Sequence, residues 1–149
     1  MTVIEELMAI AGALERHRVE YALVGGLAVA VWGAPRATKD IDLLVRPESL
    51  AQAMAAVADC GFKLAGAPLW FRDGMELQRV TKIEAGAHLT VYFILVGESL
   101  EEIWTSRQKV ETADGVLWVV SRDALIRMKA QAARPQDIAD IERLTEGDR

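Results

Sequence analysis

The sequence predicts a mixed α/β (α+β) fold, organised as a single domain over residues 1–149. Three observations support this fold class. Amphipathic helical patterns occupy both ends of the chain, short apolar runs with strand character lie between them, and turn residues separate the segments without a repeat or a linker. The composition, 52% hydrophobic and 26% charged, is ordinary for a globular domain. We therefore expect a mixed β-sheet flanked by helices, with a helical pair at the C-terminus.

The first third of the chain predicts a helix, a strand, a second helix and a second strand. Thr2 and Glu5 have the spacing of a capping box that starts a helix. Apolar residues then recur at helical spacing: Ile4, Leu7, Met8, Ala11 and Leu14. An apolar strand at 21–26 closes on two glycines, a buried helix follows at 27–33, and the next strand occupies 40–45.

The middle of the chain predicts a helix, two long strands and a short helix. Pro47 suits the first turn of a helix that continues through 49–60. The segment 75–83 alternates polar and apolar residues, and 88–96 is a nearly continuous apolar run, so both are predicted strands. A short helix is expected at 98–104.

The last third predicts a hairpin followed by the helical pair. Residues 108–121 fit two strands joined by the Asp-Gly turn between them. Ser121 caps a helix over 122–134, and Pro135 starts the final helix. The apolar residues of this final helix lie near one face: Ile138, Ile141 and Leu144.

Charge and hydrophobicity limit the classes of partner. The net charge is −5, so no overall positive field attracts nucleic acid. The N-terminus carries Glu5 and Glu6 and lacks the cationic start of a signal peptide. The longest uncharged run, 21–35, is broken by glycines and is too short to span a bilayer. These features predict a soluble, cytoplasmic protein with no membrane partner.

Two aspartates interrupt the second predicted strand. Side chains two apart on a strand point to the same face, so Asp40 and Asp42 would present their carboxylates side by side. Mg²⁺ is commonly held by one or two carboxylates together with phosphate oxygens and water. The alternative is structural: the aspartates cap the strand entrance and pair with Arg36 or Lys39.

Gly25 and Gly26 stand where the first predicted strand leads into a helix. Backbone N–H groups at such a helix start can bind an anion, and a phosphate bound there would face the two carboxylates. The alternative is a tight turn that needs positive φ. The glycine spacing matches neither the dinucleotide-binding Gly-x-Gly-x-x-Gly pattern nor a P-loop.

The segment "VGGLAVAVWGAPRATKDIDLLV" resembles the DNA polymerase β-like nucleotidyltransferase superfamily, in which a Gly-Gly turn, a helix and an Asp-x-Asp strand follow one another. Together with the later "LIRMKAQAARPQDIADIERL", it is similar to the nucleotidyltransferase-fold proteins of the AbiEii type, found in toxin–antitoxin and abortive-infection systems. The resemblance therefore implies a nucleotidyltransferase fold for this chain.

The resemblance also implies roles for the residues of the first segment. Gly25 and Gly26 would hold nucleotide phosphates, Arg36 and Thr38 would line the phosphate side, and the two aspartates would coordinate Mg²⁺, with room for a two-metal site. The implied reaction is in-line attack of a hydroxyl on the α-phosphate of a nucleoside triphosphate, which expels pyrophosphate.

A third carboxylate usually joins the site in active members of that superfamily. At the corresponding position of the predicted strand 88–96, this chain has Tyr92. A phenol is a poor metal ligand and a poor base at neutral pH. Glu76, on the neighbouring predicted strand, is the alternative source of a carboxylate.

A second group of charged residues lies near the C-terminus: Lys129, Arg134, Asp137 and Asp140. The resemblance implies that Lys129 reaches the active site as a catalytic group. The two aspartates are three residues apart and share a helical face. The alternative for the whole group is the solvated charged face of an amphipathic helical pair.

Trp70 and Phe71 form an aromatic pair in a segment flanked by glycines. They could stack a nucleobase or contact a partner protein, whereas the other tryptophans are expected to pack in the core or at its edge.

Two functional hypotheses follow from these features. The first is a Mg²⁺-dependent nucleotidyltransferase that moves a nucleotide from a nucleoside triphosphate to a hydroxyl of RNA, protein or a small molecule, as a toxin with an antitoxin partner. The second, suggested by Tyr92, is a catalytically degenerate protein of the same fold that binds a nucleotide or a partner protein. A plain structural domain would need the glycine pair and the aspartate pair to coincide by chance.

Overall fold

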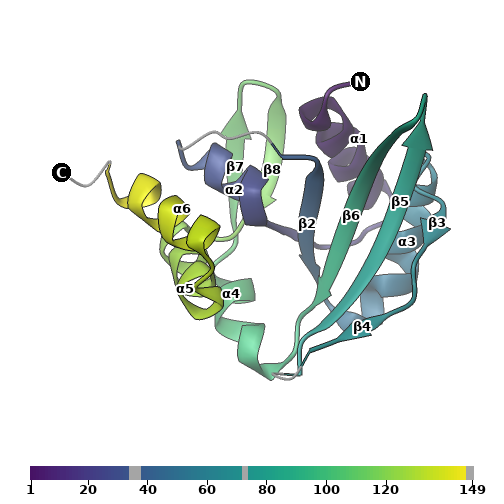
Figure 1. Cartoon of the computed structure of the whole chain (residues 1–149). Helices are drawn as coiled ribbons and strands as arrows, with labels where there is room; N and C mark the ends of the chain where they lie inside the picture. The colour runs from purple at the N-terminus through teal and green to yellow at the C-terminus, as the bar shows by residue number, and fades with distance from the viewer. Residues whose placement is uncertain (34–37, 72–73, 147–149) are drawn as a thin grey trace.

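The computed structural model describes residues 1–33, 38–71 and 74–146, and the strands within these ranges form one eight-stranded sheet (Figure 1). In chain order the strands are β1 (Ala22–Val24), β2 (Asp40–Val45), β3 (Leu64–Ala65), β4 (Leu69–Trp70), β5 (Glu76–Glu84), β6 (Ala87–Leu95), β7 (Gln108–Thr112) and β8 (Gly115–Val119). Their order across the sheet is β3-β5-β6-β2-β1-β8-β7, and β4 also pairs with β5.

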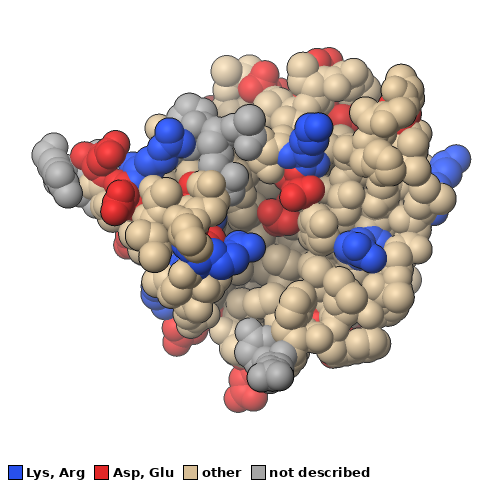
Figure 2. Space-filling view, in the orientation of Figure 1, with Lys and Arg blue, Asp and Glu red and all other residues tan. Residues whose placement is uncertain are grey.

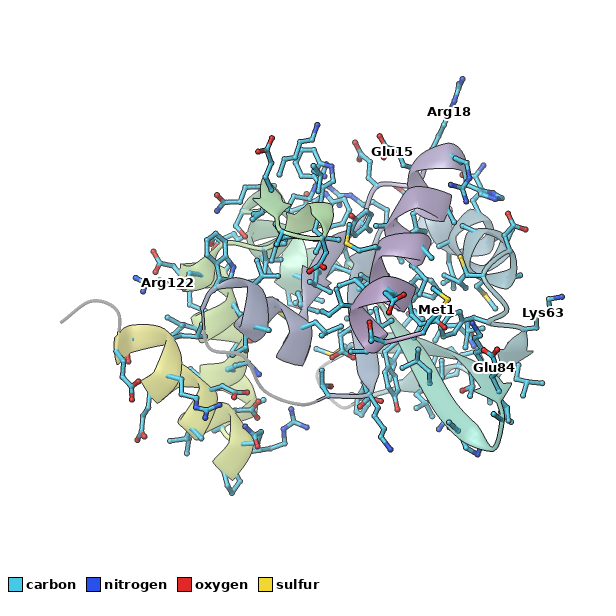
Figure 3. The ribbon with its side chains drawn as sticks, turned by 90° about the horizontal axis from the view of Figure 1, so that it is seen from above. Met1, Glu15, Arg18, Lys63, Glu84 and Arg122 are labelled. Atoms are coloured by element: carbon cyan, nitrogen blue, oxygen red, sulfur yellow. The ribbon has the colours of Figure 1, made fainter. Side chains whose placement is uncertain are left out.

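Helices cover both faces of this sheet. They are α1 (Val3–Arg16), α2 (Gly25–Val31), α3 (Leu50–Ala58), α4 (Glu101–Thr105), α5 (Arg122–Ala132) and α6 (Pro135–Glu146). Figures 1 and 3 show α1 and α3 on one face, and the α5–α6 pair on the opposite side of the molecule. Among the described residues, no helix combines the length and the apolar character that a bilayer crossing requires. The predicted fold class, a mixed sheet flanked by helices with a C-terminal helical pair, is confirmed.

The caps that the sequence predicts form at two helices. The Thr2 hydroxyl accepts a hydrogen bond from the Glu5 N–H at 3.1 Å, and the Thr2 N–H donates to the Glu5 carboxylate at 3.2 Å. At α5, the Ser121 hydroxyl accepts from the Ala124 N–H at 3.0 Å. Each cap satisfies backbone donors that the first helical turn leaves without partners, and is worth about 1 kcal/mol.

The centre of the sheet combines parallel and antiparallel pairs. β1 runs antiparallel to β2 and parallel to β8, while β2 runs parallel to β6. In this register Val24, the last residue of β1, lies opposite Asp42 of β2. Because α2 begins at the next residue, the glycine turn is placed directly beside the carboxylate strand.

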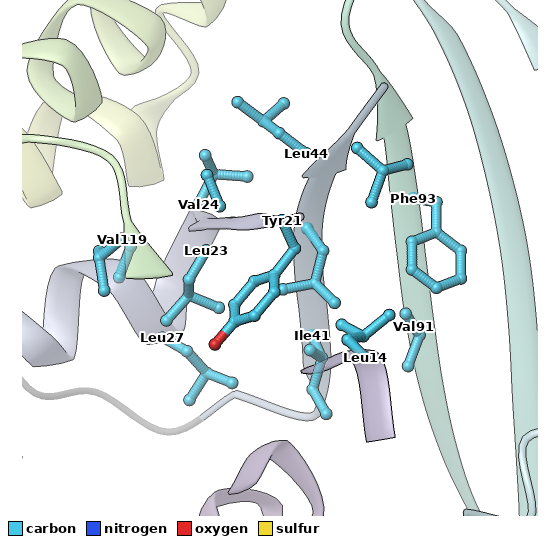
Figure 4. Close-up of a cluster of buried hydrophobic side chains, with 14 of the residues drawn as sticks. Leu14, Tyr21, Leu23, Val24, Leu27, Ile41, Leu44, Val91, Phe93 and Val119 are labelled. Atoms are coloured by element: carbon cyan, nitrogen blue, oxygen red, sulfur yellow. The ribbon is translucent and has the colours of Figure 1, made fainter. Parts of the chain in front are cut away.

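The core lies mainly between the sheet and α1 with α3 (Figure 4). Ile41 and Leu43 of β2 are fully buried, as are Phe93 of β6 and Leu14 of α1. Burying one such side chain contributes about 1.5–3 kcal/mol to folding. Alternation along β2 therefore fixes one face of the strand in the core and leaves the other face to the aspartates.

The structure departs from the sequence prediction in three places. The helix predicted to follow the glycines already begins at Gly25. The two-residue strands β3 and β4 were not predicted, because a run of two residues has no measurable period. The buried side of α6 carries Asp137 and Asp140 beside Leu144, whereas Ile138 is 50% exposed.

Candidate active site

A cavity of about 580 Å³ opens between the sheet and the α5–α6 pair. Figure 2 shows this hollow beside acidic side chains near the centre of the face. On the sheet side, the cavity is lined by residues of β2, β6 and the start of α2. On the other side, it is lined by residues of α5, α6 and their connection. The cavity therefore brings together residues that are far apart in the sequence.

Asp40 and Asp42 lie on the cavity side of β2, as the strand period predicts. Asp40 is exposed and Asp42 is half-buried. Across the parallel pair with β6, Thr90 lies opposite Asp40 and Tyr92 lies opposite Asp42. The two carboxylates thus stand on one wall of the cavity, next to a threonine and a tyrosine.

Position 25 requires glycine for two reasons, its backbone conformation and the close approach of Asp42. Its φ is +72°, a left-handed conformation that side chains rarely adopt, and a Cβ at this position would overlap the Asp42 carboxylate. The two interpretations of the glycines are therefore compatible. The turn needs positive φ, and it also lets the start of α2 approach the carboxylate. Gly26 is buried and also lines the cavity.

Thr38 lies on the same side of the cavity, just before β2. Its hydroxyl accepts a hydrogen bond from the Asp40 N–H at 3.3 Å, which ties the start of the strand to the preceding segment. Arg36, the other residue predicted to line the phosphate side, lies outside the described residues.

Tyr92 occupies the position beside Asp42 at which a third carboxylate was sought. Burial raises the pKa of the Tyr92 phenol above its ordinary value, and the negative charge of Asp40 raises it further. The phenol therefore stays protonated at neutral pH, which suits it to donate a hydrogen bond rather than to accept a proton.

Glu76 does not supply the missing carboxylate, and this alternative is wrong. Met75 and Leu77, its two neighbours in sequence, line the cavity. Because successive side chains on a strand point to opposite faces, Glu76 is directed away from the cavity, and it pairs with Trp70 at the end of β5.

Lys129 lies on the opposite wall of the cavity and is almost completely buried. Its Nζ is 2.9 Å from Asp140 Oδ2 and 3.5 Å from Asp137 Oδ1. Both carboxylates are buried too, with exposures of 1% for Asp137 and 0% for Asp140. The alternative of a solvated charged face is therefore wrong for these three residues: they form a buried ionic cluster between α5 and α6.

Arg134 lies at the turn between the two helices and links this cluster to the cavity. Its Nε donates to Asp137 Oδ2 at 2.7 Å, and a second guanidinium nitrogen donates to Asp137 Oδ1 at 3.2 Å. These hydrogen bonds raise the pKa of Arg134 and lower the pKa of Asp137. The Arg134 side chain is 74% exposed and lines the cavity, so it presents a positive charge toward the carboxylate wall.

The sequence prediction had grouped Arg134 with Lys129 but did not assign it to the site. A signal was present, because Arg134 precedes a helix whose third residue, Asp137, can hold its guanidinium. The turn that aims it into the cavity depends on Ala133, which takes the left-handed conformation with φ of 50° and donates its N–H to the Lys129 carbonyl at 2.9 Å. Sequence alone does not indicate that conformation at an alanine.

The two residues of the predicted aromatic pair have different surroundings: Trp70 ends β4, and Phe71 follows it. Phe71 lines the cavity and its N–H donates to the Met75 carbonyl at 2.9 Å. Trp70 lies opposite Glu76 and is 67% exposed. Only Phe71 is positioned to contact a ligand in the cavity.

The carboxylate wall fits Mg²⁺ by its chemistry. Asp40 and Asp42 offer hard oxygen donors side by side, and Mg²⁺ in proteins is often held by one or two carboxylates with phosphate and water completing its shell. Across the described ranges, no cluster of three or more histidine, cysteine or acidic side chains has the arrangement of a metal site. The protein's own contribution to a metal would thus be two carboxylates.

Comparison of the fold with solved structures gives strong matches at low sequence identity. A lincosamide antibiotic adenylyltransferase, LnuA, with bound lincomycin superposes with a TM-score of 0.64 and 18% identity, covering 95% of each chain. ANT(2")-Ia in complex with adenylyl-2"-tobramycin superposes with a TM-score of 0.68 and 16% identity, covering 99% of this chain and 90% of that one. At these identities the matches show a shared nucleotidyltransferase fold.

Comparison by sequence gives a family. No curated protein matches the sequence. A family model described as "Nucleotidyltransferase of unknown function (DUF6036)" matches residues 1–145. The narrower likeness to AbiEii-type proteins is tested by neither comparison and stays a prediction. Since this family model matches nearly the whole sequence, the chain belongs to this family of nucleotidyltransferases, whose fold it shares.

Proposed function

We propose that the protein binds a nucleoside triphosphate with Mg²⁺ and transfers its nucleotide to a hydroxyl group of a small molecule. One observation carries the proposal: Gly25 adopts positive φ and leaves the space of a side chain to the Asp42 carboxylate. The close approach places the Asp42 carboxylate beside the start of α2. In this arrangement, phosphate oxygens can contact both the N–H groups of the helix start and a cation held by the carboxylate.

The triphosphate would lie between the two walls of the cavity. On the sheet side, the N–H groups of Gly25 and Gly26 and the hydroxyl of Thr38 would donate to the phosphate oxygens, because these residues line the cavity together with the carboxylates. On the helical side, the exposed guanidinium of Arg134 faces the cavity, whereas Lys129 is held by Asp137 and Asp140, and its catalytic role stays a prediction from the family resemblance. Arg36 stays a prediction from the family resemblance.

Asp40 and Asp42 would hold Mg²⁺, as one ion or as a two-ion site. When bound, the metal supplies neutralisation and alignment of the phosphate oxygens. In the transfer, the acceptor hydroxyl oxygen bonds to the α-phosphorus, the bond from that phosphorus to the bridging oxygen breaks, and pyrophosphate leaves. Because Tyr92 stays protonated, a phosphate oxygen of the substrate takes the hydroxyl proton in this proposal.

A small-molecule acceptor is favoured over RNA for two reasons. The chain has a net charge of −5, which does not attract a polyanion. The two similar structures contain lincomycin and adenylyl-tobramycin, both small molecules. The toxin role, the antitoxin partner and the RNA or protein acceptor remain predictions of the AbiEii resemblance.

The experiment is a pyrophosphate-release assay with Mg²⁺, each of the four common nucleoside triphosphates and a panel of hydroxyl-bearing acceptors. Wild type is compared with the Asp40→Asn/Asp42→Asn double variant, which keeps the shape of both side chains and removes their charge. Loss of several kcal/mol of charge stabilisation lowers the rate at least about a thousandfold. Equal behaviour of the two proteins with all four nucleotides contradicts the proposal.

The second candidate is a nucleotide-binding protein without transferase activity. Tyr92 beside Asp42 favours it, because β6 brings no carboxylate to that position. Calorimetric titration with ATP and Mg²⁺ separates the two candidates. Saturable, Mg²⁺-dependent binding that requires Asp40 and Asp42, with no pyrophosphate release from any acceptor, would select the second candidate.

A further inference from the structure

Among the described residues, apolar side chains gather in one part of the cavity lining. This part is formed by six residues, which we call the apolar end: Phe71, Met75, Leu77, Ile94, Leu125 and Met128. They come from β5, β6, α5 and the connection between β4 and β5. No side chain in this set donates or accepts a strong hydrogen bond.

The apolar end continues directly from the carboxylate wall. On β6, Ile94 follows Tyr92 on the same face, and it pairs with Leu77 of β5. On α5, Leu125 and Met128 precede Lys129, so the helical wall also changes from apolar to charged along its length. The cavity therefore has one charged compartment and one apolar compartment that meet near Tyr92.

The charged side chains that line the cavity lie in its charged compartment, and their partners lie in or beside it. Lys129 and Arg134 pair with Asp137 and Asp140. Asp40 and Asp42, in the proposed function, hold the metal. A ligand group inside the apolar end consequently meets no free charge among the described lining residues, and a charged group buried there would lose its hydration without compensation.

We propose that the apolar end binds the apolar body of the acceptor, so that the acceptor is a neutral small molecule with an aromatic or aliphatic body and a hydroxyl group. This proposal rests on the proposed transferase function and names its substrate class. The volume of about 580 Å³ for the whole cavity suits a small molecule beside a nucleotide rather than a folded partner. Two methionines among six lining residues let the wall adapt to the shape of such a body.

Phe71 completes the compartment at its mouth. It is 50% exposed, and the hydrogen bond from its N–H to the Met75 carbonyl fixes its backbone beside the opening. An exposed aromatic ring at the mouth of an apolar pocket gains burial when an apolar ligand enters. A nucleobase is a poorer occupant, since its ring nitrogens and exocyclic groups need hydrogen-bond partners that the apolar end lacks.

The experiment uses the methyl signals of the five methionines of the full chain, labelled with ¹³C. Met75 and Met128 report on the apolar end, and Met54, which packs against the core from α3, is the internal reference. Three probes are titrated: phenylbutanol, butanediol, which lacks the apolar body, and phenylbutylamine, which carries a positive charge. We expect phenylbutanol to shift the Met75 and Met128 signals saturably, with butanediol inactive and the amine weaker.

A matched pair of variants tests the location. Met128→Gln introduces a polar group of similar length into the apolar end, and Met54→Gln makes the same change away from the cavity. Phenylbutanol affinity should fall about tenfold in the first variant and stay unchanged in the second. Shifts confined to Met1 or Met8, or equal shifts with all three probes, would overturn the proposal.

Two further titrations keep this inference separate from the proposed function. The Asp40→Asn/Asp42→Asn variant should lose Mg²⁺-dependent nucleotide binding and keep the phenylbutanol shifts. If ATP with Mg²⁺ competes with phenylbutanol for the apolar end, the compartment binds the base, and the acceptor proposal fails while the transferase proposal stands. If phenylbutanol binds but no nucleotide does, the transferase proposal fails, although the apolar site itself exists.

Discussion

Two pairs of aspartates lie on opposite sides of the cavity, and the two pairs differ in burial: Asp40, Asp42 and Asp137 line the cavity, whereas Asp140 is buried behind its wall. Asp40 and Asp42 stand on β2 with their side chains toward the cavity, the first exposed and the second half-buried. Asp137 and Asp140 stand on α6, buried to 1% and 0% exposure, and are neutralised by Lys129 and Arg134 of the same chain. The same side chain type is therefore exposed or half-buried on β2 and fully buried on α6.

The difference shows how the surroundings of a carboxylate indicate its purpose. A buried carboxylate needs a cation within the protein, because its desolvation costs several kcal/mol. The α6 pair has such cations, which also fixes Lys129 and Arg134 in place. The β2 pair is less buried and lines the cavity, so a ligand that enters from solvent can reach its carboxylates. The α6 pair is structural, and the β2 pair is the candidate metal site.

The largest expected effect tests the buried pair. Lys129→Met removes the charge that neutralises Asp140 inside the protein, and should lower the free energy of unfolding by about 3–5 kcal/mol. Arg127→Met is the control, since Arg127 lies on the same helix with its side chain 54% exposed, and should cost less than about 1 kcal/mol. Urea unfolding measures both. Equal stability of the two variants would contradict the structural role.

Loss of activity in Lys129→Met could result from unfolding alone. The double variant Lys129→Met/Asp140→Asn removes the buried negative charge as well and should regain part of the lost stability. If it regains stability without activity, Lys129 acts on the ligand in addition to supporting the fold.

A third carboxylate beside Asp40 and Asp42 should raise activity. Tyr92→Asp places a carboxylate beside Asp42, and should raise Mg²⁺-dependent pyrophosphate release about a hundredfold, the lower range for a positioned general base. Without Mg²⁺ the added charge should lower the melting temperature. Tyr92→Asn is the neutral control, and an equal change in both variants would show that charge is irrelevant at this position.

The glycine turn should show a smaller effect. Gly25→Ala introduces a side chain at φ +72° and into the space of the Asp42 carboxylate, which should cost about 1–3 kcal/mol and weaken nucleotide binding at least tenfold. Gly86→Ala has nearly the same φ, +79°, with no atom within 4 Å of the new Cβ, so it carries the backbone strain alone. Thermal unfolding and ATP titration compare them. Equal loss of ATP affinity would contradict the steric role of Asp42.

The smallest effect concerns acidity. Arg134 lowers the pKa of Asp137 in the folded state, so this carboxylate contributes stability above its unfolded pKa, near 4, and the contribution is lost as the pH falls below that value. Asp137→Asn should therefore lose less stability than wild type between about pH 5 and about pH 3. Asp123→Asn, at an exposed position of α5, is the control and should keep the wild-type dependence.

Sequence reasoning located the β2 pair because its signals are local. The period of a strand places Asp40 and Asp42 on one face, and the glycines sit at the strand–helix junction that precedes them. The position of Tyr92 beside the carboxylates was predicted from the family resemblance, and Tyr92 lies opposite Asp42 in the parallel pair of β2 and β6.

The buried pair could not be predicted in the same way. The apolar residues of α6 suggested a buried stripe that includes Ile138, yet Asp137 and Asp140 face α5 because Lys129 and Arg134 offer them partners there. That choice depends on the packing of one helix against another and on a left-handed alanine between them. Neither the helix packing nor the left-handed alanine can be predicted from the periodicity of a single segment.

The order in which the chain is synthesised adds a consequence of the sheet topology. β1 lies between β2, the next strand in the sequence, and β8, which is synthesised much later than β2. The glycine turn and the carboxylates thus leave the ribosome long before the wall formed by α5 and α6. A growing or truncated chain presents the acidic strand without the opposite side of the cavity, and the complete pocket exists only once the last two helices have folded against it.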